Sequence, residues 1–246
     1  MSVLLNTTPR NQPPVIADQT FTVAENSAAG AAVGTVVASD PDAGQTLSYR
    51  ITAGNAAGAF AIDSGTGQIT VANSAVLDYE TTPTFALTVR VTDNGSPALS
   101  GTATVTVNLG NVNEAPVNSV PSYPQAVTKN TAITFSRAGG NPISVADPDA
   151  GTALIQVSLT VLQGKLTLAG TAGLSFLAGD GNGDRTMTFR GTVAAVNAAL
   201  DGLKYAPDKG YTGSDSLTLT TNDLGSGLGD PLLDTDVLAI LVQDKK

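Results

Sequence analysis

Two stretches of this 246-residue chain alternate polar and apolar residues with a period of two. Residues 84–91 read Thr-Phe-Ala-Leu-Thr-Val-Arg-Val, and residues 102–109 read Thr-Ala-Thr-Val-Thr-Val-Asn-Leu. This period places the apolar side chains on one face of a β-strand. Residues 61–71 read as a strand, a glycine-containing turn and another strand. Short strands separated by turn signals predict an all-β sandwich of the Greek-key, immunoglobulin-like kind.

The pentapeptide Asp-Pro-Asp-Ala-Gly occurs twice, at residues 40–44 and 147–151. The two copies are separated by about the length of one immunoglobulin-sized sandwich, which is roughly 100 residues. Between them, residues 109–124 leave a strongly alternating strand and become rich in Asn and Pro. We therefore predict two tandem domains, residues 1–115 and residues 116–246.

One segment of the second half departs from the strand pattern. Val193, Val196, Leu200 and Leu203 recur at helical spacing, and Thr192 precedes them as a candidate N-cap. We predict one short helix inserted in the second sandwich.

Composition excludes several classes of function. The net charge of −9 and the pI of about 4.2 argue against nucleic acid and anionic membranes as partners. The chain has no Cys and no His, so a bound metal must be held by oxygen atoms, as calcium or magnesium is. Catalytic motifs such as Gly-x-Ser-x-Gly are absent, and we predict that the protein is not an enzyme.

The acidic residues of the first half gather in short motifs. Taken along the chain, these are Ala-Glu-Asn at 24–26, Asp-Pro-Asp at 40–42, Leu-Asp-Tyr-Glu at 77–80, Val-Thr-Asp-Asn-Gly at 91–95 and Asn-Val-Asn-Glu-Ala-Pro-Val at 111–117. In this order, residues 11–117 resemble a cadherin repeat. Residues 175–236 resemble the cadherin-like repeats of large bacterial surface adhesins. For one aspartate, a turn or cap would be the simpler interpretation, but five motifs in family order favour calcium.

The resemblance implies two groups of calcium ligands. An interdomain site would use Glu25, Asp78, Glu80, Asn111, Asn113, Glu114, Asp147, Asp149 and Asp223. A weaker half-site at the N-terminal pole of the first domain would use Asp40, Asp42 and Asp93.

Several residues depart from the family pattern. Asn111 stands where many members have Asp, and Lys129 occupies in the second domain the place of Glu25 in the first, so no complete site is expected at the far pole. Residues 180–184, Asp-Gly-Asn-Gly-Asp, open like an EF-hand loop. Arg185 follows where that loop needs Gly, which favours a hairpin turn. Asp215 is interpreted as a structural turn residue.

Two functions fit these features. A short, two-repeat chain resembles the rhizobial adhering proteins (the Rap family), which implies a secreted, calcium-dependent adhesin or lectin. Its partners would be acidic bacterial exopolysaccharide or capsular polysaccharide and the cell surface. The alternative is a calcium-rigidified spacer of a larger adhesin that binds no sugar. The resemblance also implies export by type I secretion, and residues 1–14, which lack the features of a Sec signal peptide, agree with that route.

Overall fold

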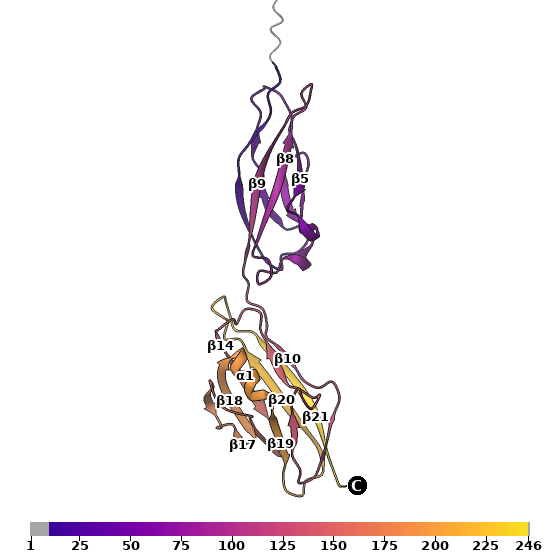
Figure 1. The fold of residues 1–246 in the computed structure, drawn as a ribbon, viewed down its shortest axis with the longest axis vertical. Coiled ribbons are helices and arrows are strands. Elements are labelled where there is room, and N and C mark those ends of the chain that lie inside the picture. Colours follow the sequence, from indigo (N-terminus) through magenta and orange to yellow (C-terminus); the bar gives the residue numbers. More distant parts are fainter. Residues whose placement is uncertain (1–9, 246) are drawn as a thin grey trace, which may run out of the picture. The chain divides into compact units, whose positions relative to one another are not determined.

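The computed structural model describes residues 10–245, which divide into two compact units between Val112 and Asn113 (Figure 1). The boundary predicted from the sequence lies three residues further along. Most of the segment examined for a Sec signal, residues 1–9, lies outside the described residues. Across residues 10–245, no helix is both long enough and apolar enough to cross a membrane.

The first unit is a sandwich of two sheets. The larger sheet has four strands in the order β2 (Gln19–Ala24), β9 (Ser100–Gly110), β8 (Thr84–Thr92) and β5 (Ser48–Ala53). Strands β2 and β9 are parallel, and the other neighbours are antiparallel. The smaller sheet has the order β3 (Ala32–Thr35), β7 (Gln68–Val71) and β6 (Phe60–Ile62), and a separate pair is formed by β1 (Val15–Ile16) and β4 (Ala38–Ser39). Short 3-10 turns occupy Ala56–Gly58 and Ser74–Val76.

The apolar side of the predicted alternation forms the core of this sandwich. Leu87, Val89 and Val105 are completely buried, and each such side chain contributes about 1.5–3 kcal/mol through its removal from water. Phe60 on the smaller sheet meets Phe85 on the larger sheet edge to face, with 5.1 Å between ring centroids. The strands predicted over residues 84–91 and 102–109 are therefore confirmed.

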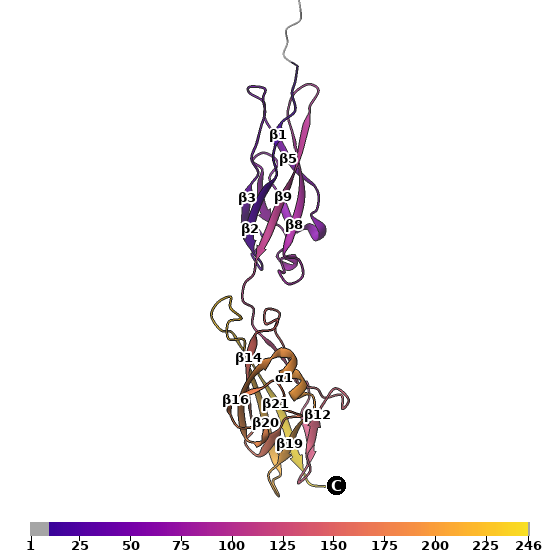
Figure 2. The same cartoon turned by 60° about the vertical axis from the view of Figure 1, so that its left-hand side comes forward.

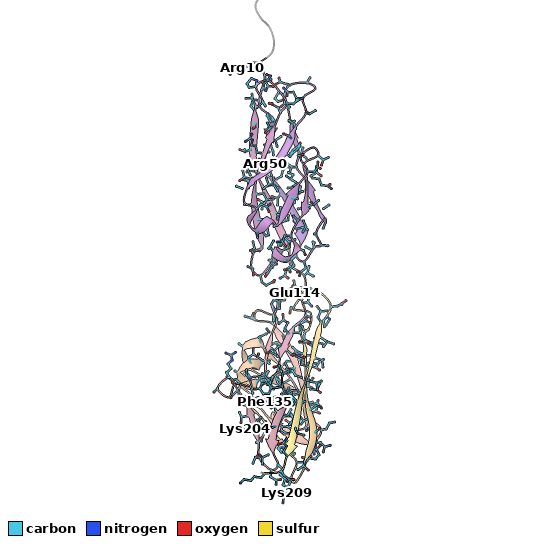
Figure 3. All side chains as sticks on the ribbon, turned by 90° about the vertical axis from the view of Figure 1, so that its right-hand side faces the viewer. Arg10, Arg50, Glu114, Phe135, Lys204 and Lys209 are labelled. Atoms are coloured by element: carbon cyan, nitrogen blue, oxygen red, sulfur yellow. The ribbon has the colours of Figure 1, made fainter. Side chains whose placement is uncertain are left out.

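The second unit is also a sandwich (Figure 2). Its larger sheet has the order β11 (Gln125–Thr128), β21 (Leu233–Gln243), β20 (Gly213–Asn222), β14 (Leu154–Thr160), β18 (Thr186–Thr192) and β16 (Ser175–Ala178). Its smaller sheet has the order β12 (Ile133–Phe135), β19 (Leu203–Pro207), β15 (Gly164–Thr167) and β17 (Asn182–Asp184), and β10 (Val117–Ser119) pairs with β13 (Ser144–Ala146). Phe135, labelled in Figure 3, is completely buried in the core of this unit.

The predicted helix of the second unit is present as α1 (Val193–Leu200). Thr192 caps it, because its Oγ1 accepts a hydrogen bond from the Ala195 N–H at 3.2 Å. Leu203, predicted on the same apolar face, lies in strand β19 instead. Gly202 takes a φ of +120°, which turns the chain out of the helix before Leu203.

A buried carboxylate fastens the second sandwich internally. Asp215 on β20 accepts hydrogen bonds from the Leu162 N–H at 3.1 Å, the Gln163 N–H at 2.9 Å and the Tyr205 hydroxyl at 2.8 Å. Burial, and then the neighbouring Asp215 carboxylate, raises the pKa of Tyr205 well above its ordinary value. The phenol therefore stays a hydrogen-bond donor. Asp215 is structural, as the sequence indicated, but it lies within strand β20 and not in a turn.

Candidate metal centre

One buried carboxylate organises the C-terminal end of the first unit. Glu25 directly follows β2 and is 2% exposed. Its Oε2 accepts the Tyr79 N–H at 2.7 Å, and its Oε1 accepts the Val112 N–H at 2.8 Å. These charge-assisted bonds tie the loop after Ser74–Val76 and the segment after β9 to one side chain.

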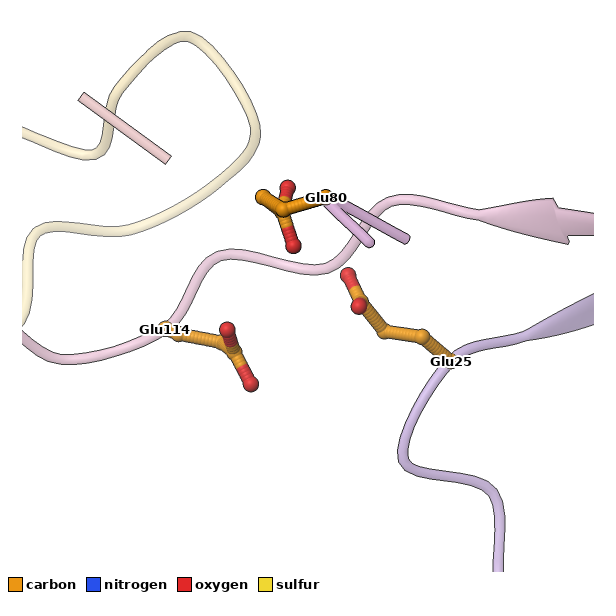
Figure 4. Close-up of side chains that lie close together, drawn as sticks. All are labelled: Glu25, Glu80 and Glu114. Carbon is orange, nitrogen blue, oxygen red and sulfur yellow. The ribbon is translucent and has the colours of Figure 1, made fainter. Parts of the chain in front are cut away.

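The other predicted ligands of the first unit lie in these same two segments. Asp78 accepts the N–H of Thr81 at 2.8 Å and its hydroxyl at 2.9 Å, so it also caps a local turn. Asn111 donates its amide to Glu80 Oε1 at 3.0 Å. Glu80 lies in the same loop as Asp78, and Glu114 lies two residues beyond Val112, at the start of the second unit. Figure 4 labels Glu25, Glu80 and Glu114, which are three of the predicted ligands.

The predicted ligands of the second unit gather at its N-terminal end. Asp223 follows β20, is 0% exposed, and accepts the side-chain amide of Asn113 at 2.7 Å and the N–H groups of Gly225 and Leu232, each at 2.7 Å. Asp147 and Asp149 follow β13. Asp149 Oδ2 accepts the Glu114 N–H at 2.7 Å.

Several oxygen atoms of these residues have no hydrogen-bond donor within the described part of the chain. Asp147 Oδ2, Asp149 Oδ1 and Asn113 Oδ1 in the second unit are in this state, as is Asn111 Oδ1 in the first, and all four atoms are buried. A buried acceptor without a donor costs about 1–3 kcal/mol, and more when it is charged. Within each unit, a bound cation would satisfy such acceptors. An all-oxygen set of carboxylates and amides is the donor type that calcium prefers, so these residues fit that ion.

The electrostatics of Asp147 point the same way. Burial is the main cause that raises the pKa of Asp147, and the charges of Asp223 and Asp149 add to it. Hydrogen bonds from the N–H groups of Ala150 and Asp149 oppose this shift without cancelling it. The fold therefore holds the ionised form of Asp147 less favourably than an exposed aspartate is held, and a nearby positive charge would offset this.

The N-terminal end of the first unit repeats several hydrogen bonds of this arrangement. The side-chain amide of Asn11 donates to Asp93 at 3.1 Å, as Asn113 does to Asp223. The Gln12 N–H donates to Asp42 Oδ2 at 2.7 Å, as that of Glu114 does to Asp149. Asp40 Oδ2 is again a buried acceptor without a donor in the described residues. The half-site predicted from Asp40, Asp42 and Asp93 is thus brought together.

Hydrogen bonds set the charge state of Asp93 in this half-site. Burial acts to raise the pKa of Asp93, but hydrogen bonds from the N–H groups of Leu99 and Gly95 and from the Asn11 amide outweigh it. The pKa of Asp93 therefore lies below its ordinary value, and the carboxylate stays available to a cation.

Residues 19–110 match the family model of the cadherin domain. Human Protocadherin-16 is 33% identical over 205 residues, and human Protocadherin Fat 1 is 36% identical over 131 residues. These matches cover 76% and 51% of this chain, but the chain spans only 6% and 3% of the two relatives.

Solved structures show the same fold. Human CDH23 EC21-23 superposes with a TM-score of 0.52 and 19% identity, covering 92% of this chain and 72% of that one. PcdhgB3 EC1-4 gives a TM-score of 0.54 and 22% identity, covering 95% and 50%. The predicted fold is confirmed, with two cadherin-type β-sandwich domains and one short helix in the second. The relatives named here are animal proteins, and the bacterial affiliation stays a prediction.

Sequence reasoning missed three polar groups at the N-terminal ends of the two units. Asn11 and Gln45 bring uncharged amides to the N-terminal half-site, where Gln45 Oε1 is a buried acceptor without a donor in residues 10–245. The carbonyl of Asp230 accepts the Asn113 amide at 3.1 Å. The likeness of Asn-Gln-Pro-Pro at 11–14 to Asn-Glu-Ala-Pro at 113–116 was a signal that could have identified Asn11. A backbone carbonyl carries no such signal.

Lys129 and residues 180–184 are two places where the sequence departs from the pattern of a calcium site. Lys129 follows β11 as Glu25 follows β2, and it forms an ion pair with Asp244 at the opposite end of the second unit. At residues 180–184, Asp184 Oδ2 accepts the N–H groups of Asp180 at 3.0 Å and Gly181 at 2.8 Å. The hairpin interpretation is only partly right. The segment lies between the antiparallel neighbours β16 and β18, but its residues 182–184 form strand β17, which pairs with β15 in the other sheet.

Replacing Glu25 with alanine should loosen the C-terminal end of the first unit. The Tyr79 and Val112 N–H groups would lose their acceptor, at a cost of about 1–3 kcal/mol for two partly buried donors. Amide hydrogen exchange should show protection lost at these two positions first. Glu25→Gln keeps one carbonyl oxygen and should retain protection at one of the two amides. Unchanged exchange in Glu25→Ala would contradict the role given to this carboxylate.

Proposed function

We propose that this chain is a calcium-binding, extracellular module of the adhesion type, built from cadherin-like repeats. One observation carries the proposal: the acidic residues in family order include buried carboxylate and amide oxygens that lack donors in the described residues. The cadherin-domain match over residues 19–110 supports it. The role is one of binding and mechanical support, with no catalytic step.

Calcium would act here by neutralising repulsion and ordering loops. Asp147, Asp149 and Asp223 bring three carboxylates together, and their mutual repulsion opposes the folded arrangement when no cation is present. A bound ion converts that repulsion into attraction and fixes the segments that carry the ligands. In this way calcium rigidifies the chain and suits it to serve as a spacer or adhesion module.

Calorimetric titration of the whole chain tests the proposal. We expect saturable calcium binding with a dissociation constant of about 10⁻⁴–10⁻³ M or tighter, as in extracellular calcium modules. Magnesium should bind more weakly, because it demands near-ideal octahedral geometry and gives up its water reluctantly. No heat of calcium binding at millimolar concentrations would rule out the module as proposed.

A second candidate function is binding of acidic exopolysaccharide, as the resemblance to the Rap family implies. The observation that favours it is the outer face of the four-stranded sheet in the first unit. There β9 directs Ser100, Thr102, Thr104 and Thr106 outward, which offers hydroxyl groups to a sugar without an aromatic platform. Titration with acidic polysaccharide, with calcium and with a chelator, separates the candidates. Absence of binding in both conditions would end the polysaccharide proposal and leave the calcium module standing.

A further inference from the structure

Two arginines stand directly opposite each other on the outer face of the first unit. Arg50 on β5 is the cross-strand partner of Arg90 on β8, and Arg90 in turn is the partner of Thr102 on β9. Both arginines are exposed, and Figure 3 labels Arg50 on this unit. Their strand neighbours Ile51 and Val89 pack on the core side, so the two guanidinium groups share the solvent-facing side.

This pairing is unfavourable for the fold. Like charges directly opposite on neighbouring strands destabilise a sheet. Residues 10–112 contain only three basic side chains, with Arg10 as the third, against eight acidic ones. Within the described residues, neither Arg50 nor Arg90 lies within ion-pair distance of a carboxylate. The single hydrogen bond of the pair runs from Arg90 Nε to Thr92 Oγ1 at 3.4 Å. Two charges are thus concentrated where no acid of the chain neutralises them.

Hydroxyl groups border the pair on both sides along the strands. One neighbouring row contains Ser48, Thr92 and Ser100, and the hydroxyls of Thr92 and Ser100 are 2.8 Å apart. The other neighbouring row pairs Thr88 with Thr104. Small hydroxyl side chains therefore surround the two arginines on this face of the sheet. They can donate hydrogen bonds to a hydroxylated ligand and accept hydrogen bonds from it.

This chemistry selects a class of ligand. A guanidinium group presents its donors as a planar fork that matches a carboxylate. A nucleic acid would require a longer basic track, because its affinity comes from many phosphate contacts, and the chain carries a net charge of −9. The ligand that matches this surface therefore has one carboxylate surrounded by hydroxyl groups, which is the chemistry of a uronic acid unit in a polysaccharide.

We propose that Arg50 and Arg90 form a binding site for the carboxylate of an acidic polysaccharide, with the adjacent Ser and Thr hydroxyls contacting the sugar. The inference rests on the second candidate function and assigns it a location. It involves none of the predicted calcium ligands, so the site and the calcium module can be tested separately.

The test uses the whole chain, with polygalacturonate as the probe. The wild-type protein should bind it, and binding should weaken with added salt because screening acts on exposed charges. The Arg50→Gln, Arg90→Gln double variant should bind about tenfold more weakly or worse, which corresponds to the loss of at least one charge-assisted hydrogen bond. Circular dichroism should show an intact fold, since the change removes a like-charge pair from an exposed face.

Matched controls make the result specific. Lys165→Gln with Lys204→Gln removes two exposed positive charges from the second unit and should leave polygalacturonate binding unchanged. Neutral dextran should not bind. Dextran sulfate that bound as tightly, with the same dependence on the two arginines, would overturn the assignment of a carboxylate.

Two further outcomes are distinguishable. If the wild-type chain binds polygalacturonate and the arginine variant binds it equally well, the location proposed here is wrong while polysaccharide binding stands. If the wild-type chain binds no acidic polysaccharide, the second candidate function and this site both fail, and calcium binding is unaffected.

Discussion

Calcium should raise the unfolding temperature of this chain by about 10 °C, and the Asp147→Asn, Asp149→Asn double variant should lose most of that gain. At a calcium concentration 100-fold above the dissociation constant, binding adds about 2.7 kcal/mol of stability. For units of this size, each kcal/mol of added stability raises the unfolding temperature by several degrees. Both asparagines keep a carbonyl oxygen for the hydrogen bonds that Asp147 and Asp149 accept, so the fold itself should survive.

The metal-free protein gives the same experiment a second readout, in its dependence on pH. Because the pKa of Asp147 is raised in the folded state, protonation of Asp147 stabilises the fold. This contribution is fully present below the pKa of the unfolded chain and is lost as pH rises through the raised folded pKa. Without calcium, the double variant should therefore equal or exceed the wild type in stability near neutral pH, while responding less to added calcium.

Scanning calorimetry with calcium and with a chelator measures both effects. The matched control is Asp180→Asn with Asp184→Asn, which removes two charges from the local turn of residues 180–184. That control should keep the full calcium response. An unchanged response in the Asp147, Asp149 variant would exclude these residues as ligands.

The sequence prediction that ligands of both domains serve the same ions needs a separate measurement. Combining Glu80→Gln with the Asp147, Asp149 variant forms a double-mutant cycle in calcium affinity. Strong non-additivity is expected if the ions are shared. Simple addition of the two losses would indicate separate sites.

Asp215→Ala should destabilise the second unit by about 3–5 kcal/mol. The change leaves the Leu162 and Gln163 N–H groups without their acceptor, and the buried Tyr205 hydroxyl keeps only the more distant Gln163 carbonyl, at 3.4 Å. Urea unfolding should show the midpoint falling while the first unit is unaffected. Tyr205→Phe removes only one of these donors and should cost far less. A loss below about 1 kcal/mol in Asp215→Ala would mean that water replaces the carboxylate at little cost.

Much of the fold follows from side-chain periodicity. The alternation in residues 84–91 identified β8 because one face is completely buried, and Thr192 marked the start of α1. The end of that helix was predicted wrongly. Leu203 continues the helical spacing of the apolar residues, but it belongs to strand β19, so its spacing is a coincidence. Local pattern cannot separate these cases when a single glycine changes the direction of the chain.

The candidate site was predictable where its residues are charged, and less so elsewhere. The acids stand out because a chain with few charges places them in short motifs. Asn11 and Gln45 do not, since uncharged amides are common in loops. The opposition of Arg50 and Arg90 depends on strand register across 40 residues and on a bulge between Ile51 and Ala53, which no local pattern reveals.

Lys129 has in the second unit the place that Glu25 has in the first, so the two units differ in how many of their ends carry candidate cation ligands. The first unit has candidate cation ligands at both ends, whereas the second has them at its N-terminal end and closes its other end with the Lys129 ion pair. If calcium joins such units, the first unit offers ligands to a neighbour at either end, whereas the second offers them at one end alone. An assembly of such units through calcium would then be directional, because only one end of the second unit offers ligands of this kind.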